Sequence, residues 1–286
     1  MAAACMLCQF QIGSLPDFFI LPKTSTMKKV SSILLMAIAA IFYSCGESKT
    51  TGETGDIADT AASEDGFVSL FDGSSLNGWE GDSTYWRVEG GNIVGELTEG
   101  TPLKTNTFLI WTGGEPDDFE LKGEFKITES GNSGIQYRSE RLDTIPYALR
   151  GYQADIDGKN SYTGQNYEER KRTTLAYRGQ ITTIRPQDTP GNLRDNIESN
   201  AWKGLEVTGE LGDRDSLKTE INAEDWNSFR LVIKGNRLQH YINETLMSDV
   251  TDEDEVNRAM SGSLGIQVHV GPPMKVELKN LYLKEL

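Results

Sequence analysis

The chain has 286 residues, of which 28 are basic and 43 acidic, giving a formal net charge of -15 at pH 7. This charge argues against nucleic acids, anionic membrane surfaces and acidic polysaccharides as main partners, because few cations are left to neutralise them. A hydrophobic fraction of 37% is enough for a packed core, and 29 glycines with 9 prolines are typical of a turn-rich β fold.

The N-terminal region has the features of a secretory signal. Two lysines after Met27 precede an apolar run, Val30–Tyr43, that is too short to cross a bilayer. A small residue then precedes Cys45, as at the cleavage site of bacterial lipoproteins. We interpret residues 27–45 as a lipoprotein signal peptide that leaves a lipid-bearing Cys45, with plain secretion as the alternative. Residues 1–26 are then an extension upstream of the true start.

This interpretation places the protein in the bacterial cell envelope, facing the periplasm or the cell surface and touching the membrane through its lipid only. Cys5 and Cys8 form an isolated CxxC with no second pair, a very weak metal or redox motif. If processing occurs at Cys45, no other cysteine remains, which excludes disulfides and cysteine catalysis. Residues 46–65 are polar and contain no aromatic residue, so they are expected to form a flexible tether before a domain at 66–286.

Short alternating segments dominate this domain. Phe119–Ile127 and Met274–Leu283 alternate apolar with charged residues, and Gly235-Asn236 joins two apolar-rich segments as a hairpin turn would. A long polar stretch follows the first of these segments, at 157–179, and its tyrosine and arginine content favours a binding loop. Many short strands without a long amphipathic helix predict an all-β sandwich.

Three segments combine an apolar face with an unusual polar one. They are Ser133–Arg138, Gly151–Asp157 and Gly265–Val270. Because side chains on a strand alternate between faces, each segment presents a polar pair on one side. The pairs are Gln136 with Arg138, Gln153 with Asp155, and Gln267 with His269. Any one of them is as consistent with an exposed sheet face as with a site, but the three together favour the lining of a polar groove.

An ordered set of motifs runs through the domain and resembles a known family. The set consists of Phe71–Gly73, Leu76–Trp79, Trp86–Val88, Gly131–Ile135, Gly151–Asp155, Trp226–Asn227, Gly235–Arg237, Gln267–His269, Gly271–Pro273 and Lys279–Leu286. The sequence is similar to the 3-keto-disaccharide hydrolase domain family over nearly all of 66–286. That resemblance implies a concanavalin A-like jelly roll, two antiparallel sheets with a concave face that binds sugar. The chain departs from the family at Asn243-Glu244, at Val270, and at Gln153, where some members have Glu.

The resemblance also implies a reaction on a carbohydrate, a 3-keto-glucoside or related disaccharide. A C3 ketone acidifies the C2 proton, so a base can remove it, the C1 leaving group can depart, and water can add afterwards. Retaining glucanases of the same architecture use paired Glu residues, but Gln153 cannot be a carboxylate nucleophile. For this reaction our candidate base or acid is Asp155, with Glu168 as the next candidate and His269 as the partner that titrates near neutral pH.

The remaining expected site residues bind substrate. Arg138 is expected to stabilise an enolate or orient the sugar, and the other substrate-binding residues are Gln136, Gln153, Gln267, Tyr167 and Arg170. Asp155, Asp157, Glu168 and His269 could together hold a divalent metal, but their spacing fits no closed motif, so the metal stays an open question.

Less specific interpretations stand beside these roles. Asp155 could form an ion pair with an arginine, His269 could be structural, and the charged run Glu168–Arg172 is most often solvated. His240 is interpreted as structural. At the level of the whole protein, the alternatives to an enzyme are a non-catalytic carbohydrate-binding module of the envelope and, less well supported by the polar pairs, a structural envelope protein.

Overall fold

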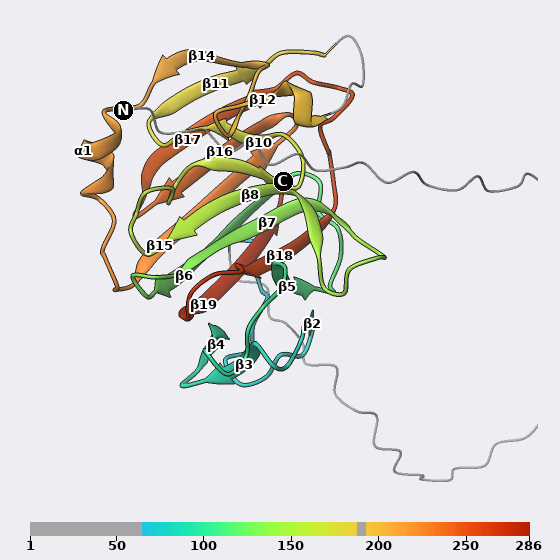
Figure 1. The fold of residues 1–286 in the computed structure, drawn as a ribbon, viewed down its shortest axis with the longest axis vertical. Coiled ribbons are helices and arrows are strands. Elements are labelled where there is room, and N and C mark those ends of the chain that lie inside the picture. The colour runs from blue at the N-terminus through green and yellow to red at the C-terminus, as the bar shows by residue number, and fades with distance from the viewer. Residues whose placement is uncertain (1–64, 188–192) are drawn as a thin grey trace, which may run out of the picture. The chain divides into compact units, whose positions relative to one another are not determined.

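The computed structural model describes residues 65–187 and 193–286 (Figure 1). The extension at 1–26, the signal peptide with Cys45 and nearly all of the tether at 46–65 lie outside the described residues, so those remain predictions. No helix within the described residues combines the length and apolar character needed to cross a membrane.

The described residues form two sheets. The larger has ten strands, and β1 (Val68–Ser69) pairs with β19 outside the main order. That order is β14 (Leu205–Glu210), β11 (Gln180–Ile184), β17 (Thr245–Asp252), β16 (Arg237–Ile242), β15 (Asn227–Lys234), β6 (Phe119–Ile127), β19 (Met274–Glu285), β4 (Asn92–Leu97) and β3 (Trp86–Glu89).

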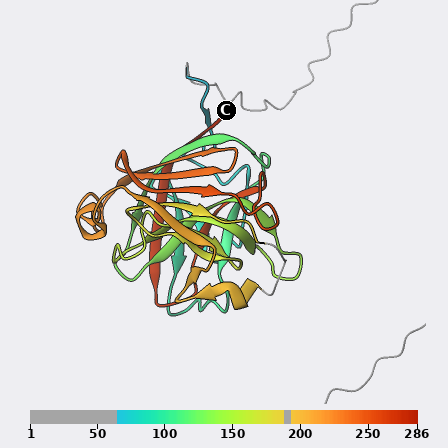
Figure 2. The same cartoon turned by 90° about the horizontal axis from the view of Figure 1, so that it is seen from above.

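The second sheet has nine strands. Their order is β12 (Ile197–Glu198), β13 (Ala201–Trp202), β10 (Thr173–Ala176), β9 (Asn166–Glu169), β8 (Leu149–Asp157), β7 (Asn132–Arg141), β18 (Ser263–Val268), β5 (Thr107–Trp111) and β2 (Trp79–Glu80). Pairing is antiparallel except between β11 and β17 and between β10 and β13. The helical elements described are a 3-10 turn at Leu193–Asn196 and α1 (Arg214–Lys218), which stands at the side of the strands in both views (Figures 1 and 2).

Alternation along the strands builds the core between the sheets. Every second residue of β6 is buried, as the sequence pattern predicts. On β8, Tyr152, Ala154 and Ile156 pack into the core, as do Ile266 and Val268 on β18. The opposite side chains of β7, β8 and β18 therefore lie on the outer face of the nine-stranded sheet. This arrangement confirms the predicted jelly-roll sandwich and leaves the predicted polar face available for a site.

The ends of β7 and β8 bend back over that outer face. The amide of Phe108 on β5 donates to the carbonyl of Tyr147, in the β7–β8 connection, over 2.9 Å. Leu149, at the start of β8, forms a small buried cluster with Phe108 and Ile110. Gly151 allows this bend, because a Cβ there would lie 2.5 Å from Ser139 Oγ. One end of the outer face is thus covered by the chain itself, and the other end stays open.

Candidate functional site

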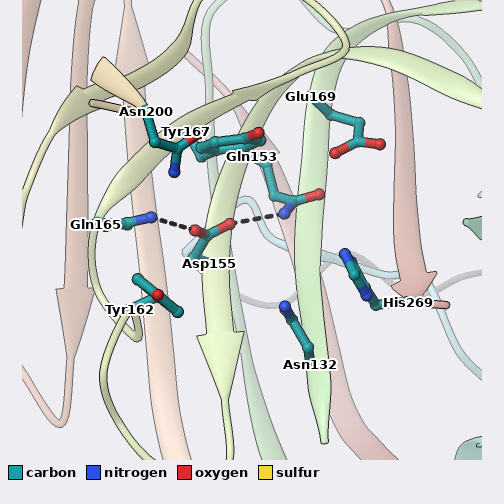
Figure 3. A pocket seen from close by; sticks show the side chains of 9 residues that line it. All are labelled: Asn132, Gln153, Asp155, Tyr162, Gln165, Tyr167, Glu169, Asn200 and His269. Atoms are coloured by element: carbon teal, nitrogen blue, oxygen red, sulfur yellow. Dashed lines mark hydrogen bonds between the residues drawn. The ribbon is translucent and has the colours of Figure 1, made fainter. Parts of the chain in front are cut away.

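A polar pocket of about 200 Å³ opens on the outer face of the nine-stranded sheet. Strands β7, β8 and β9 supply its floor, and the segments around residues 162, 200 and 269 supply its walls (Figure 3). The lining residues are Asn132, Gln153, Asp155, Tyr162, Gln165, Tyr167, Glu169, Asn200 and His269. Four residues of the predicted site line this pocket: Gln153, Asp155, Tyr167 and His269.

Asp155 lies at the centre of the pocket floor between two amide donors. Gln153 Nε2 donates to Oδ1 over 2.6 Å, and Gln165 Nε2 donates to Oδ2 over 2.5 Å (Figure 3). Burial raises the pKa of Asp155 to about 7, the two amide hydrogen bonds oppose that rise, and the nearby charges of Asp157 and Glu169 add to it. A carboxyl group with this pKa is present in both protonation states near neutral pH, which suits an acid or a base. No arginine of the described chain pairs with it, so the ion-pair interpretation of Asp155 is wrong.

A chain of amide hydrogen bonds fixes the orientation of Gln153. Ser139 Oγ donates to Gln136 Oε1 over 2.5 Å, and Gln136 Nε2 donates to Gln153 Oε1 over 2.7 Å. Because the amide oxygen of Gln153 accepts from Gln136, its amide nitrogen must point toward Asp155. The side chain of Gln153 also lies over Gly134, where a Cβ would come within 2.5 Å of it. Gln136 is itself fully buried, so it acts beneath the pocket and does not line it.

Two buried glutamines carry amide atoms without a partner among the described residues. Gln165 Oε1 is one of them, and both Nε2 and Oε1 of Gln267 are the others. Leaving a buried amide atom unpaired costs roughly 1–3 kcal/mol, so these atoms have reason to bond a water or a ligand hydroxyl. Gln165 lines the pocket, whereas Gln267 is fully buried and does not.

His269 and Glu169 form the side of the pocket opposite Gln165 (Figure 3). His269 Nδ1 lies 2.6 Å from the carbonyl oxygen of Val270, which can only accept, so Nδ1 carries the proton and Nε2 has no hydrogen-bond partner among the described residues. Asn106 links the two residues: its Nδ2 donates to Glu169 Oε1 over 3.0 Å, and its Oδ1 accepts from the amide of Val270. Asn106, just before β5, thus contacts both Glu169 and the residue after His269.

Glu169, rather than Glu168, is the second carboxylate of the pocket. Glu168 pairs with Tyr152 across β8 and β9 and points into the core, where its Oε2 accepts from Arg172 Nε over 2.6 Å. Burial works to raise the pKa of Glu168, but Arg172 and then Lys171 outweigh it and lower that pKa. Glu168 therefore lies outside the pocket, and its expected catalytic role has no geometric support. Side chains two residues apart on a strand share a face, so the predicted site residue Tyr167 would have indicated Glu169 instead.

Arg138 also lies away from the pocket, although alternation placed it beside Gln136. The register shifts between Tyr137 and Glu140, and Arg138 has a φ of 44°, so the strand rotates at this point. Its guanidinium donates to the carbonyls of Asp117 and Gly235 over 2.6 to 2.8 Å and is 1% exposed. The arginine thus ties together loops of the two sheets, and the predicted enolate-binding role has no geometric support.

Of the two remaining expected residues, one lines the pocket and the other does not. Tyr167 lines the pocket, and burial with Glu169 and Asp155 beside it raises the pKa of Tyr167 to about 12, so it stays a hydrogen-bond donor. Arg170 is directed instead to Thr105 Oγ1, at 2.7 Å. The charged run that contains it is not solvated as expected, because Glu168 and Arg172 at its ends have no exposed surface.

The four residues considered for a metal do not gather. Asp157 is used to hold the 161–163 loop, accepting from the amides of Ser161, Tyr162 and Thr163, while Glu168 pairs with Arg172. In the part of the chain that the structure describes, no three His, Cys, Asp or Glu side chains are grouped as metal ligands.

His240 is packed in the core, in agreement with its structural interpretation. Its Nε2 lies 2.8 Å from Tyr137 Oη, and Nδ1 lies 3.3 Å from the carbonyl of Gln165. Burial lowers the pKa of His240 to about 4. This histidine therefore supports the segment that carries Gln165 and has no access to a ligand.

The raised pKa of Asp155 predicts a pH-dependent stability. The folded protein holds the proton up to about pH 7, whereas an unfolded Asp releases it near 3.8, so Asp155 stabilises the fold most below pH 3.8 and loses that contribution as the pH rises through 7. Between pH 5 and 7 this amounts to about 2 kcal/mol. Urea unfolding of the wild type and Asp155→Asn across this range should show the difference between them changing by that amount. A constant difference would contradict it.

The fold and the site define a jelly-roll β-sandwich protein with an amide- and carboxylate-lined pocket on one of its two sheets. Residues 66–284 match the family model described as a 3-keto-alpha-glucoside-1,2-lyase-like domain. Because the match covers most of the chain, the protein belongs to this family.

Individual relatives agree with this assignment. The chain is 23% identical over 227 residues to the 3-keto-disaccharide hydrolase of Bacteroides thetaiotaomicron, covering 72% of this chain and 74% of that protein. A crystal structure from Parabacteroides distasonis, described as a candidate glycosyl hydrolase, has a TM-score of 0.50 at 19% identity and covers 79% of this chain and 99% of that one. The carbohydrate-binding module CBM66 of Bacillus subtilis has a TM-score of 0.45 at 15% identity, covering 73% and 96%, too low a similarity to support an argument.

Proposed function

We propose that the protein cleaves 3-keto-glycosides by removing the C2 proton and expelling the C1 substituent. The observation that carries the proposal is the central carboxyl of Asp155, buried among amides with a pKa near 7. A base of that pKa takes up a proton from carbon and can release it again near neutral pH. The family match to 66–284 supplies the expected substrate class.

In the proposed reaction, Asp155 takes the C2 proton and the electron pair forms an enolate through the C3 carbonyl. The C1–O bond then breaks, and the leaving oxygen is protonated to give a free alcohol. Water adds across the resulting double bond, its oxygen to C1 and a proton to C2, to give the free 3-keto-sugar. The candidate groups for protonating the leaving oxygen are His269, through Nε2 of its doubly protonated form, and the protonated carboxyl of Glu169, since both residues line the pocket.

The enolate oxygen would be stabilised without a lysine or arginine from the described lining of the pocket. The amide donors Asn132 and Asn200 and the phenol of Tyr167 remain to bind it. Fixed neutral donors stabilise a developing charge effectively when water is excluded. Gln165 is expected to bind sugar hydroxyls through its unpaired oxygen.

The test is incubation of the domain at 66–286 with 3-keto-trehalose and with a 3-keto-β-glucoside, following release of free 3-keto-glucose. Release is the expected result, and a parallel reaction with a chelator decides the metal requirement. A protein that binds unoxidised sugar but releases nothing from either substrate would instead be a carbohydrate-binding module. The amide-rich lining of the pocket gives that second function its support.

We also propose that the mature protein is a lipoprotein anchored through Cys45, on the strength of the signal-like sequence at 27–45. Mass spectrometry of the mature N-terminus should find a lipid on Cys45, and globomycin should block processing. An unmodified N-terminus downstream of Cys45 would rule the anchor out.

A further inference from the structure

A second cavity, of about 420 Å³, is lined by residues of β11, β14 and the start of α1. Its main polar lining residues are Tyr177, Arg178, Gln180, Glu210, Asp213 and Arg214. None of these residues has a role in the proposed proton transfer. The cavity is larger than the site pocket and differs from it in character, because it contains two guanidinium groups.

The loop at 161–163 connects the residues of the two cavities. On one side of this loop, Tyr162 lines the site pocket. On the other side, Arg214 Nη2 donates to the carbonyl of Ser161 over 2.6 Å, and Arg178 Nη1 donates to the carbonyl of Thr163 over 2.7 Å. The arginines of the second cavity are therefore bonded to the loop that carries Tyr162 of the site pocket.

Neither arginine is neutralised. Within the described residues, Arg178 and Arg214 make no ion pair, and the hydrogen bonds of Arg178 go to the carbonyls of Thr163 and Arg214. Arg178 is 3% exposed, and its hydrogen bonds among those residues come from Nε and Nη1, which leaves Nη2 without one. Burial lowers the pKa of Arg178, and the adjacent charge of Arg214 lowers it further. Two neighbouring cations of this kind favour an anion between them.

The acidic residues of the cavity do not neutralise the two arginines. The carboxylate of Asp213 caps α1, where its Oδ1 accepts from the amides of Asp215 and Ser216 and from Ser216 Oγ. Glu210 is exposed and forms no ion pair among the described residues. More distant acids, Asp157 and Asp215, offset the charge of Arg178 only in part, since its pKa stays lowered.

We propose that this cavity binds an oxyanion, a carboxylate or sulfate group, carried by the leaving group of a glycoside whose keto-sugar ring occupies the site pocket. The cavity's affinity for an anion stands on its own geometry, whereas the link to a leaving group rests on the proposed function. Arg178 and Arg214 hold the anion, and the ring of Tyr177, stacked under Arg214 at 5.2 Å, forms one side of the cavity.

Anion binding is tested by calorimetry with sodium sulfate and with D-glucuronate at constant ionic strength, using D-glucose as the neutral probe. The wild type should bind both anions, and Arg214→Gln should weaken binding at least tenfold, as expected for the loss of a charged hydrogen-bond donor. Arg214 is exposed, so this variant should fold. Arg178→Gln should have the same effect, with its folding checked by thermal unfolding. Arg87→Gln, which removes an exposed arginine from the far edge of the larger sheet, is the matched control and should bind as the wild type does.

Equal sulfate affinity in the wild type and Arg214→Gln, or no binding by the wild type, would overturn the site. Asp155→Asn should still bind sulfate while losing turnover, so failure of the proposed reaction leaves this result intact. The link to the leaving group is tested with a 3-keto-glycoside of a uronic acid and its neutral counterpart. Arg214→Gln should lower kcat/KM at least tenfold for the acidic substrate only, and an equal loss for both would refute the link.

Discussion

Asp155→Asn is expected to reduce turnover of a 3-keto-glycoside by roughly 10²–10⁴-fold, the usual effect of removing a general base. Asparagine keeps the shape of the side chain but cannot accept the C2 proton. It also changes the local hydrogen bonding, because Gln153 and Gln165 both present donors to this position. The measurement is the initial rate of 3-keto-glucose release, with the thermal midpoint recorded for each protein.

Asp249→Asn is the matched control. Asp249 is also a buried carboxylate with nitrogen donors, here Arg237 and Gln239, but it lies on β17 of the other sheet. This variant should turn over substrate at nearly the wild-type rate. If both variants lost activity alike, or if Asp155→Asn retained it, the role assigned to Asp155 would be wrong.

Arg172→Met is expected to destabilise the fold by about 3–5 kcal/mol, because it leaves buried carboxylates without their cation. Arg172 has no exposed side-chain surface and contacts Glu168, Asp252 and Asp254 at 2.6, 2.6 and 3.4 Å. For a domain of this size, such a loss lowers the thermal midpoint by about 10 °C. Calorimetric or urea unfolding measures it directly.

Arg170→Met provides the comparison within the same turn. Its side chain is partly exposed, forms an ion pair with Glu169 at 3.6 Å and donates to Thr105 Oγ1, so the stability change should stay below about 1 kcal/mol. Comparable losses for the two variants would show that the core ion cluster is not what holds the β9–β10 turn in place.

Much of the sandwich could be predicted because local pattern and tertiary position agree. Strict alternation in Phe119–Ile127 gave the burial of β6, and Gly235-Asn236 marked the hairpin between β15 and β16. The polar face of β8 was also correct, since Gln153 and Asp155 point outward from a strand whose other side chains are buried. These are cases where hydrophobic period alone decides the face.

The wrong predictions concern residues whose face the hydrophobic alternation does not decide, and charged residues that lie in the core. The bulge that rotates Arg138 has no signature in its apolar pattern, so that residue was assigned to the wrong face. The run from Glu168 to Arg172 looked solvated, because sequence does not reveal that Asp252 and Asp254 meet Arg172 in the core. Asn106 and Asn200 were missed for a related reason: both come from loops that reach the pocket only in three dimensions.

The strand order has a consequence for how the protein is made. β18 inserts between β5 and β7, and β19 inserts between β6 and β4, so the final segments of the chain fill the middle of each sheet. During vectorial synthesis, the early strands must wait with unpaired edges until Ser263–Glu285 emerges. His269 arrives in that same interval, so a nascent chain acquires its ligand-binding pocket only as the sandwich closes. Deletion of β18 and β19 should therefore prevent folding of the whole domain, and not only of its C-terminal part.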